Sequence, residues 1–251
     1  MSEQFLDFSP QMFAGKTVLV SGGTSGIGLE IARGFKKLGA TTLATGSSGE
    51  KVAACRGRNE DGAIRFQQLD VSNSEEVASL FASLPQLDVL VNAAGVARPE
   101  EEYSEDVFLR VMDINLNSVM RLSEAAMPLL LASKGSVVNV ASMLSYLADA
   151  SVPAYCASKS GVTGLTRALA HRYGPQGVRI NAVAPGYHQT EMTRPLWSDK
   201  KEAEHIRHRT ALKRWGRAED LTGAVIFLSS GAAQYITGVT LPVDGGYVSG
   251  M

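Results

Sequence analysis

Short apolar runs alternate with longer stretches of helical periodicity along the whole chain. The apolar runs predict strands at residues 17–21, 41–45, 64–68, 87–92, 136–141, 178–183 and 239–243. The stretches between them predict helices near residues 26–39, 74–83, 104–132, 153–173, 200–209 and 218–230. Such alternation is typical of a parallel sheet with helices on both faces. The near-continuous apolar runs fit strands that are covered on both sides.

The length of the chain and its alternating strands and helices favour one α/β domain over residues 1–251. We find no internal repeat, low-complexity segment or linker-like stretch. The formal net charge is −1, with charges scattered along the chain. This pattern gives no sign of a nucleic-acid or anionic-membrane partner.

Targeting and metal-binding signals are also missing from the sequence. No apolar run reaches the roughly 18 residues of a membrane span, and residues 1–7 are acidic where a secretory signal would be basic. Cys55 and Cys156 make no disulfide framework, and the four histidines have no metal-ligand spacing. His205 and His208 lie in a charged stretch that favours a solvated surface. We therefore expect a cytoplasmic protein without a metal site.

A glycine-rich segment, Ser21-Gly22-Gly23-Thr24-Ser25-Gly26-Ile27-Gly28, joins the first strand to the first helix. Glycines let the backbone approach a phosphate, and a helix N-terminus offers free N–H groups and partial positive charge. The spacing Gly-x-x-x-Gly-x-Gly departs from the dinucleotide fingerprint Gly-x-Gly-x-x-Gly. The segment therefore favours nucleotide binding, while a purely structural turn stays the alternative.

Tyr155 and Lys159 are four residues apart, and Ser142 lies thirteen residues before Tyr155. A four-residue step places both side chains on one helix face. Free tyrosine ionises near pH ~10. A neighbouring cation favours the phenolate, so we predict a lowered Tyr155 pKa suited to acid–base chemistry. The Ser142 hydroxyl could hold a substrate oxygen, whereas the alternative is a chance pair on a surface helix.

Taken together, these motifs resemble the short-chain dehydrogenase/reductase family over roughly residues 12 to 248. The family's markers occur in its order: Ser21–Gly28, Leu69-Asp70-Val71, Asn92-Ala93-Ala94-Gly95, Asn115, Ser142, Tyr155 with Lys159, Pro185-Gly186 with Thr190, and Asp244-Gly245-Gly246. The resemblance implies a single doubly wound Rossmann domain with a mostly seven-stranded parallel sheet. It also implies an NAD(P)-dependent oxidoreductase that transfers hydride between nicotinamide and a secondary alcohol or ketone of sugar, polyol or 3-oxoacyl type.

The resemblance gives four residues catalytic roles. Tyr155 would be the acid or base, and Lys159 would hold the ribose hydroxyls and bias Tyr155 toward the phenolate. Ser142 would bond the substrate oxygen, and Asn115 would order a water that links Lys159 to solvent. Asn115 lies in mid-helix, where asparagine has poor propensity, and its alternative is an exposed polar position, for which Asn117 is the better example. The complete set argues against the alternative function, a non-catalytic NAD(P)-sensing regulator.

The resemblance likewise implies a cofactor site at the ends of several strands. Its residues are Gly22, Thr24, Ser25, Gly26, Ile27, Gly28, Thr45, Gly46, Ser47, Asp70, Val71, Asn92, Ala93, Ala94, Gly95, Tyr155, Lys159, Pro185, Gly186 and Thr190. Ala93 stands where many relatives carry a second asparagine. Asp70 has an alternative role as a helix cap, which Ser72 or Asn73 could fill equally well.

The end of the second strand bears on the choice between the two nicotinamide cofactors. An acid there binds the ribose of NAD and repels the 2′-phosphate of NADP. Gly46 occupies that place, and Thr45, Ser47 and Ser48 could donate to a phosphate. Ser25 argues the other way, because many NADP-binding relatives carry a basic residue there. The balance favours NADP(H) over NAD(H).

Residues 187–215 are expected to close over a small carbonyl or alcohol substrate. The candidate substrate contacts are Ser142, Leu144, Tyr155, Tyr187 and His188, and His188 has a surface-loop alternative. Lys213, Arg214 and Arg217 could receive an acyl-carrier protein or be plain solvated surface. Small residues recur on one side of the predicted helix 153–173, and the resemblance implies that this helix packs subunits into a homotetramer or homodimer.

Overall fold

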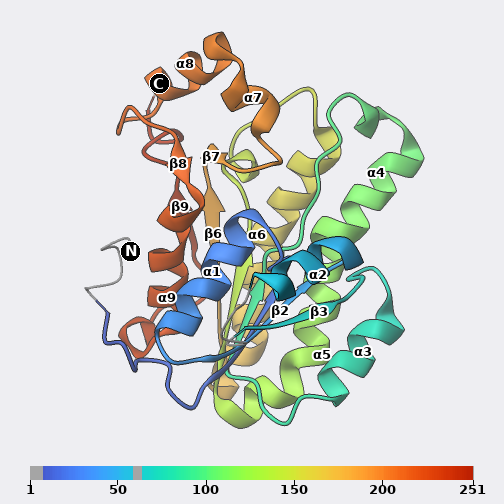
Figure 1. The fold of residues 1–251 in the computed structure, drawn as a ribbon, viewed down its shortest axis with the longest axis vertical. Coiled ribbons are helices and arrows are strands. Elements are labelled where there is room, and N and C mark those ends of the chain that lie inside the picture. Colours follow the sequence, from blue (N-terminus) through green and yellow to red (C-terminus); the bar gives the residue numbers. More distant parts are fainter. Residues whose placement is uncertain (1–7, 59–63, 251) are drawn as a thin grey trace.

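The computed structural model describes residues 8–58 and 64–250, so the acidic N-terminal stretch 1–7 lies outside the described residues. Seven parallel strands form one sheet in the order β3-β2-β1-β4-β5-β6-β9 (Figure 1). Their bounds are β1 Thr17–Ser21, β2 Thr41–Gly46, β3 Ile64–Gln68, β4 Val89–Asn92, β5 Ser136–Val140, β6 Arg179–Pro185 and β9 Thr240–Val243. All seven predicted strands are present, and the predicted doubly wound parallel sheet is confirmed.

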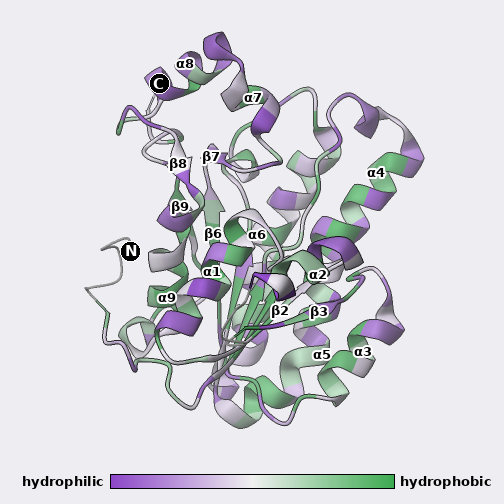
Figure 2. Ribbon diagram, in the orientation of Figure 1, coloured by the Kyte–Doolittle hydropathy of each residue, from purple (hydrophilic) through white to green (hydrophobic). Residues whose placement is uncertain are grey.

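The core lies on both faces of the central strands. In β1, Val18 and Val20 face one side and Leu19 faces the other, and all three are fully buried. Leu19 pairs with Leu43 of β2 and Leu90 of β4. Figure 2 shows this apolar centre between helices whose outer sides are hydrophilic. Burial on both faces explains why the strands are apolar without alternation.

Two sets of helices cover the sheet. On one face the core contains residues of α1 Gly26–Lys37, α2 Gly49–Gly57 and α9 Thr222–Ser229. On the other it contains residues of α3 Ser74–Ala82, α5 Ser118–Ser133 and α6 Pro153–Tyr173. Helix α2 was not predicted from the sequence, because it buries only Val52 and Cys55 and has little apolar periodicity.

The single helix predicted over residues 104–132 is wrong in one respect. A 3₁₀ turn at Glu101–Tyr103 leads into α4 Glu105–Met112, and a π-helical turn at Asp113–Asn117 separates α4 from α5. π-Helical turns inside helices occur frequently at functional sites. Here the turn carries Asn115, which is fully buried, whereas Asn117 is exposed as predicted.

The segment after β6 lies above the carboxyl end of the sheet (Figure 1). It contains β7 His188–Gln189, α7 Arg194–Ser198, α8 Lys200–Arg209 and β8 Gly216–Arg217. An aromatic cluster anchors it, in which the Tyr187 ring lies 5.6 Å from Trp215 and 5.2 Å from Tyr247. No helix in the described parts of the chain is long and apolar enough to cross a membrane.

Candidate active site

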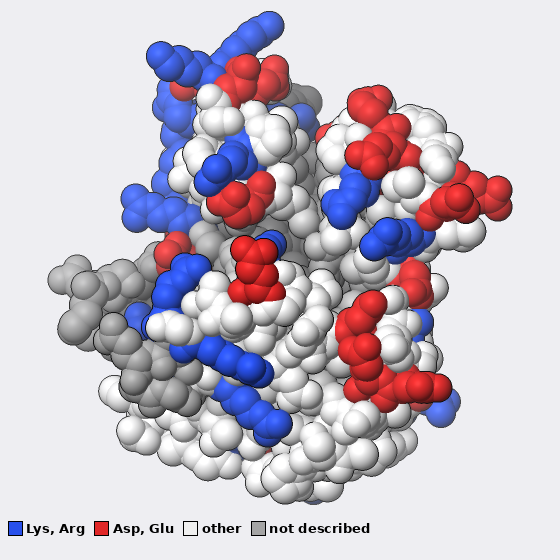
Figure 3. Space-filling model, turned by 45° about the vertical axis from the view of Figure 1, so that its right-hand side comes forward, with Lys and Arg blue, Asp and Glu red and all other residues white. Residues whose placement is uncertain are grey.

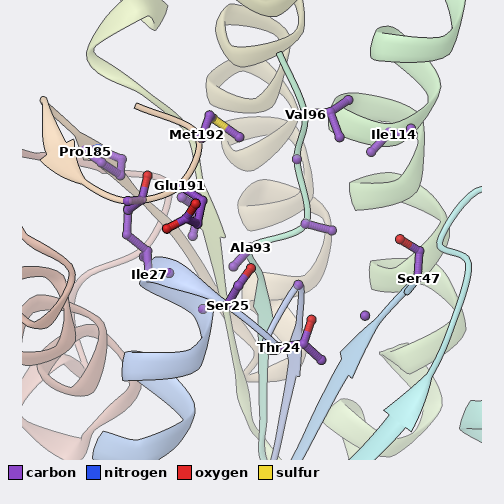
Figure 4. A pocket seen from close by; sticks show the side chains of 18 of the residues that line it. Thr24, Ser25, Ile27, Ser47, Ala93, Val96, Ile114, Pro185, Glu191 and Met192 are labelled. Atoms are coloured by element: carbon purple, nitrogen blue, oxygen red, sulfur yellow. The ribbon is translucent and has the colours of Figure 1, made fainter. Parts of the chain in front are cut away.

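A cavity of about 360 Å³ opens at the carboxyl ends of the central strands. The strand order reverses between β1 and β4, and open α/β sheets bind their ligands in the crevice at such a switch point. Figure 4 shows Thr24, Ser25, Ile27 and Ala93 at its floor, with Glu191 close to Ile27 and Met192 above them. The glycine-rich segment and the Tyr155 helix therefore meet in one cavity.

Steric contacts explain the glycines at the floor. Gly22 has φ +71°, and a Cβ there would lie 2.6 Å from the Ala94 nitrogen. A Cβ on Gly28 would collide with the Gly22 carbonyl oxygen. Helix α1 then starts at Gly26 with no side-chain cap from Ser25 and no acidic residue in its first turn. These N-terminal N–H groups face the cavity in the arrangement that binds phosphates.

The end of β2 forms one edge of the cavity. A Cβ on Gly46 would collide with the Thr24 hydroxyl and methyl group, so the Thr24 side chain occupies the place that an acidic side chain would need. Ser47, Ser48 and Lys51 line the cavity here. Ser48 caps helix α2 by accepting from the Lys51 N–H at 3.2 Å. Lys51 and the α2 N-terminus bring positive charge to this edge, and Glu50 lies in the same first turn of α2.

Of the predicted cofactor residues, some line the cavity and others support the sheet behind it. Those that line the cavity are Gly22, Thr24, Ser25, Gly26, Ile27, Gly28, Gly46, Ser47, Asp70, Val71, Ala93, Ala94, Gly95, Tyr155, Lys159, Pro185, Gly186 and Thr190. Thr45 and Asn92 do not, because both are buried in the sheet. Asn92 instead donates to Asn139 Oδ1 at 2.9 Å and ties β4 to β5.

Asp70 is free for a ligand role because another residue caps the next helix. Asn73 accepts from the N–H groups of Glu75 and Glu76 at the start of α3. The Asp70 carboxylate accepts from the Ser72 hydroxyl at 2.6 Å and from the Ser72 N–H at 2.9 Å. These bonds lower the Asp70 pKa, so the side chain is a fixed anion at the cavity edge.

Three predicted catalytic residues converge at the far end of the cavity. Ser142 follows β5, and Tyr155 and Lys159 project from α6. The Lys159 ammonium is fully buried and donates to the Val140 carbonyl at 2.7 Å. Its Nζ lies 5.6 Å from the centre of the Tyr155 ring. The structure therefore brings Ser142, Tyr155 and Lys159 together at one cavity.

The predicted lowering of the Tyr155 pKa is wrong for this structure. Burial of the Tyr155 hydroxyl raises its pKa, and the hydrogen bond with the Ser142 side chain only partly opposes this. Burial also lowers the pKa of Lys159, to about 8. In a desolvated site the cost of the charged form outweighs the attraction expected from the four-residue spacing.

Asn115 does not line the cavity but holds its wall. Its Oδ1 accepts from the Val96 N–H at 2.8 Å, and its Nδ2 donates to the Val96 carbonyl at 2.9 Å and to Ser158 Oγ at 3.2 Å. The amide therefore joins the segment after β4 to helix α6. This network engages both amide hydrogens, so the predicted water-ordering role does not fall to the Nδ2 group.

The predicted substrate contacts are placed unevenly. Ser142, Tyr155 and His188 line the cavity, whereas Leu144 and Tyr187 pack in the neighbouring apolar cluster. His188 is buried rather than on a surface loop, and its Nδ1 lies 3.0 Å from the Gly186 carbonyl oxygen. Burial lowers its pKa, which favours the neutral ring.

Further lining residues escaped the sequence analysis. They are Lys51, Val96, Ile114, Val140 and Ala141. Ser48, named as a possible phosphate donor, Leu69 of the Leu69-Asp70-Val71 motif, and residues 191–193 of the expected cover also line the cavity. The cap Ser48 followed by Lys51 was a readable signal for helix α2 and its cation. The other four escaped residues carry no motif and reach the cavity only through the tertiary fold. Among the described residues, no group of three or more histidine, cysteine or acidic side chains could hold a metal ion.

These features define a dinucleotide-dependent enzyme, and comparison with known proteins agrees. The family model described as enoyl-(acyl carrier protein) reductase matches residues 22–248. The chain is 38% identical to the 2-dehydro-3-deoxy-D-gluconate 5-dehydrogenase of Bacillus subtilis, over 94% of this chain and 95% of that one. It is 35% identical to the 3-oxoacyl-[acyl-carrier-protein] reductase of Rickettsia bellii, over 93% and 97%. A crystal structure of a gluconate 5-dehydrogenase from Burkholderia cenocepacia, in complex with NADP and tartrate, is 32% identical with a TM-score of 0.89, over 97% and 99%.

The chain therefore belongs to the short-chain dehydrogenase/reductase family. It is an NAD(P)-dependent oxidoreductase of CH–OH groups, as predicted from its motifs. The regulatory alternative finds no support among these relatives, which are named dehydrogenases and reductases.

Proposed function

We propose that this enzyme oxidises a secondary hydroxyl of a sugar acid with NADP⁺, or reduces the corresponding ketone with NADPH. The observation that carries the proposal is the single cavity that joins the glycine-rich floor to Ser142 and Tyr155. The sugar-acid class rests on relatives named for gluconate and 2-dehydro-3-deoxy-D-gluconate, at 34–38% identity.

The catalytic residues divide the proton chemistry among themselves. When bound, the cofactor supplies or accepts the hydride. Tyr155 Oη gives its proton to the substrate oxygen during reduction and takes it back during oxidation. The Ser142 hydroxyl holds that oxygen where charge develops. Lys159 holds the ribose hydroxyls, and Asn115 acts as a positioning residue that fixes the wall beside them.

NADP(H) is the proposed cofactor because of the β2 edge. Gly46 leaves no space for an acid, and Ser47, Ser48 and the Lys51 ammonium offer donors and positive charge to a 2′-phosphate. Solved structures of relatives with bound NADP support this choice. A kcat/KM at least tenfold higher with NADH than with NADPH would contradict it.

A substrate panel tests the function. We expect NADP⁺-dependent oxidation of gluconate, or NADPH-dependent reduction of its 5-keto product, with kcat/KM at least ~10⁴ M⁻¹s⁻¹ for the preferred sugar acid. The second candidate is reduction of 3-oxoacyl thioesters, which the Rickettsia relative favours. A kcat/KM for an acetoacetyl thioester tenfold above every sugar acid would replace the first proposal by the second.

We also propose a single catalytic domain in which residues 187–215 close over the substrate. Thr190 supports this, since its side chain faces Gly26 of the floor and its carbonyl accepts from the Trp197 indole at 2.9 Å.

The free thiols Cys55 and Cys156 favour a reducing cytoplasmic setting. The exposed Leu109 and Met120 on α4 and α5 favour packing into a homotetramer, which light scattering would test against a monomer.

A further inference from the structure

A buried carboxylate, Glu102, lies behind the catalytic tyrosine. The segment Glu100-Glu101-Glu102-Tyr103-Ser104-Glu105-Asp106 is strongly acidic. Figure 3 shows acidic side chains on the upper right lobe and on several other parts of the same face. Glu100, Glu101, Glu105 and Asp106 are exposed. Glu102 alone in this run turns inward, with 1% of its surface accessible. A carboxylate is costly to bury unless its oxygens are bonded, so this orientation has a specific cause.

Both Glu102 oxygens accept backbone hydrogen bonds. Oε1 accepts from the Arg98 N–H at 2.8 Å, and Oε2 accepts from the Tyr155 N–H at 2.8 Å. Tyr155 is the third residue of α6, where N–H groups lack helical partners, and the preceding Val152 provides no side-chain cap. Glu102 thus caps the catalytic helix from a distant segment of the chain.

The Tyr155 carbonyl is held as well. Ser158 Oγ donates to it at 2.8 Å and accepts from Asn115 Nδ2 at 3.2 Å. Two further bonds join the same segments, because the Glu100 N–H donates to the Ser151 carbonyl at 2.8 Å and the Tyr103 hydroxyl donates to the Ala150 carbonyl at 2.7 Å. The segment after β4 therefore fixes the start of α6, and Glu102 makes the contact at the reacting residue itself.

We propose that Glu102 is a positioning residue for the reaction, which sets the place of Tyr155 by holding its backbone N–H with a buried carboxylate. The proposal rests on the proposed function, in which Tyr155 exchanges the proton. The charge acts in the same direction as burial, since Glu102 and Cys156 both disfavour the phenolate while Ser142 favours it. Lys159 faces the ring from the same helix.

Glu102→Gln tests the proposal, with Glu101→Gln as the matched control on the exposed neighbour. Glutamine keeps the size of the side chain but turns one acceptor into a donor, which then faces an N–H group. We expect a kcat at least about tenfold lower, because small displacements of a reacting group are costly, with NADPH affinity within about twofold of the control. Removing the negative charge lowers the Tyr155 pKa, so the acidic limb of the oxidation pH profile moves to lower pH.

Two results would overturn the proposal: a kcat within about twofold of the Glu101→Gln control, or a loss of kcat matched by an equal loss of NADPH affinity. If Glu102→Gln does not fold, Glu102→Asp carries the test, because it keeps the charge but shortens the reach. Its kcat should fall below that of Glu101→Asp with NADPH affinity unchanged, and an equal kcat would refute the role.

Hydrogen exchange separates this proposal from the proposed function. The peptide that contains the Tyr155 amide should exchange faster in Glu102→Gln than in Glu101→Gln, whether or not a substrate is known. Faster exchange without turnover on any substrate in the wild type would defeat the proposed function and leave the positioning contact standing. If the Tyr155 peptide exchanges equally fast in Glu102→Gln and Glu101→Gln while the wild type turns over substrate, the positioning role of Glu102 alone is wrong.

Discussion

The floor of the cavity and its cover are built by different means. At the floor, Gly22, Gly28 and Gly46 stand where backbone or neighbouring atoms leave no room for a Cβ. The cover after β6 has such glycines at its two ends, where a Cβ would lie 2.6 Å from Asp244 at Gly186 and 2.5 Å from His188 at Gly216. Between them, side-chain contacts such as Tyr187 against Trp215 and Tyr247 hold the segment in place. The difference teaches that cofactor binding is fixed by the path of the backbone, whereas substrate choice is left to replaceable side chains.

The largest expected effect lies where floor and cover meet. Tyr155→Phe removes the hydroxyl that exchanges the proton, so turnover should fall by ~10²–10⁴-fold. Cofactor affinity, followed by nicotinamide fluorescence, should stay close to that of the wild type because the floor is untouched. Tyr235→Phe, at an exposed position, is the matched control. Wild-type turnover in Tyr155→Phe would remove this residue from the mechanism.

One added methyl group should disturb the glycine-rich floor of the cavity. In Gly28→Ala the new Cβ meets the Gly22 carbonyl, so we expect at least tenfold weaker NADPH binding and a loss of roughly 1–3 kcal/mol in the free energy of unfolding. Gly223→Ala in α9 is the control, since nothing lies within 4 Å of its added Cβ. Helix propensity should make the control up to about 1 kcal/mol more stable. Equal NADPH binding by both variants would contradict a sterically fixed floor.

The buried charge of Lys159 lowers the free energy of unfolding of the protein. Its pKa is lowered from 10.5 to about 8 by burial, so the folded protein carries a cost of about 3 kcal/mol while the lysine is charged. Because this pKa is depressed in the folded state, its contribution to stability rises between pH 8 and pH 10.5 and is lost as the pH falls through 8.

Lys159→Met should therefore lose activity yet unfold at higher urea concentration than the wild type at pH 7. The gain should be below about 3 kcal/mol, because the Val140 carbonyl loses its donor. The gain should shrink as the pH rises toward 10, whereas Lys200→Met at the exposed start of α8 should show no such trend. A variant less stable than the wild type at pH 7 would argue against a costly buried charge.

The smallest predicted effect concerns cofactor choice at the β2 edge. Lys51→Ala removes one charge beside the proposed 2′-phosphate site, which should lower kcat/KM for NADPH roughly tenfold and leave NADH nearly unchanged. Lys200→Ala, outside the cavity, should alter neither value. An equal effect of Lys51→Ala on both cofactors would place the 2′-phosphate elsewhere.

The sequence revealed most of the fold and the floor because strong local constraints mark both. Continuous apolar strands and glycines without room for a Cβ leave few alternatives, and Tyr155 and Lys159 are joined by helical spacing alone. Helix α2 escaped prediction since it buries little. The π-helical turn at Asp113–Asn117 escaped because no local pattern marks it, and its Asn115 is bonded to Val96 in another segment.

The other sequence-based predictions that proved wrong failed because burial by residues distant in the sequence cannot be read from local spacing. Spacing places a cation beside Tyr155 but does not show that both groups are desolvated, which reverses the expected direction of the Tyr155 pKa. Glu102 looked like one acid among many, and only the fold shows that it turns inward to the Tyr155 amide. Leu144 and Tyr187 stood near the motif in sequence, yet they pack beside the cavity rather than in it.

Titration of the purified protein with NADPH and NADH, followed by nicotinamide fluorescence, tests the central claim most directly. The account predicts saturable binding, tighter for NADPH, because the glycine floor and the Ser47–Lys51 edge are already formed in the fold. Binding of neither cofactor would mean that Gly22, Gly26 and Gly28 serve only as a structural turn, and the assignment of this cavity to hydride transfer would be wrong.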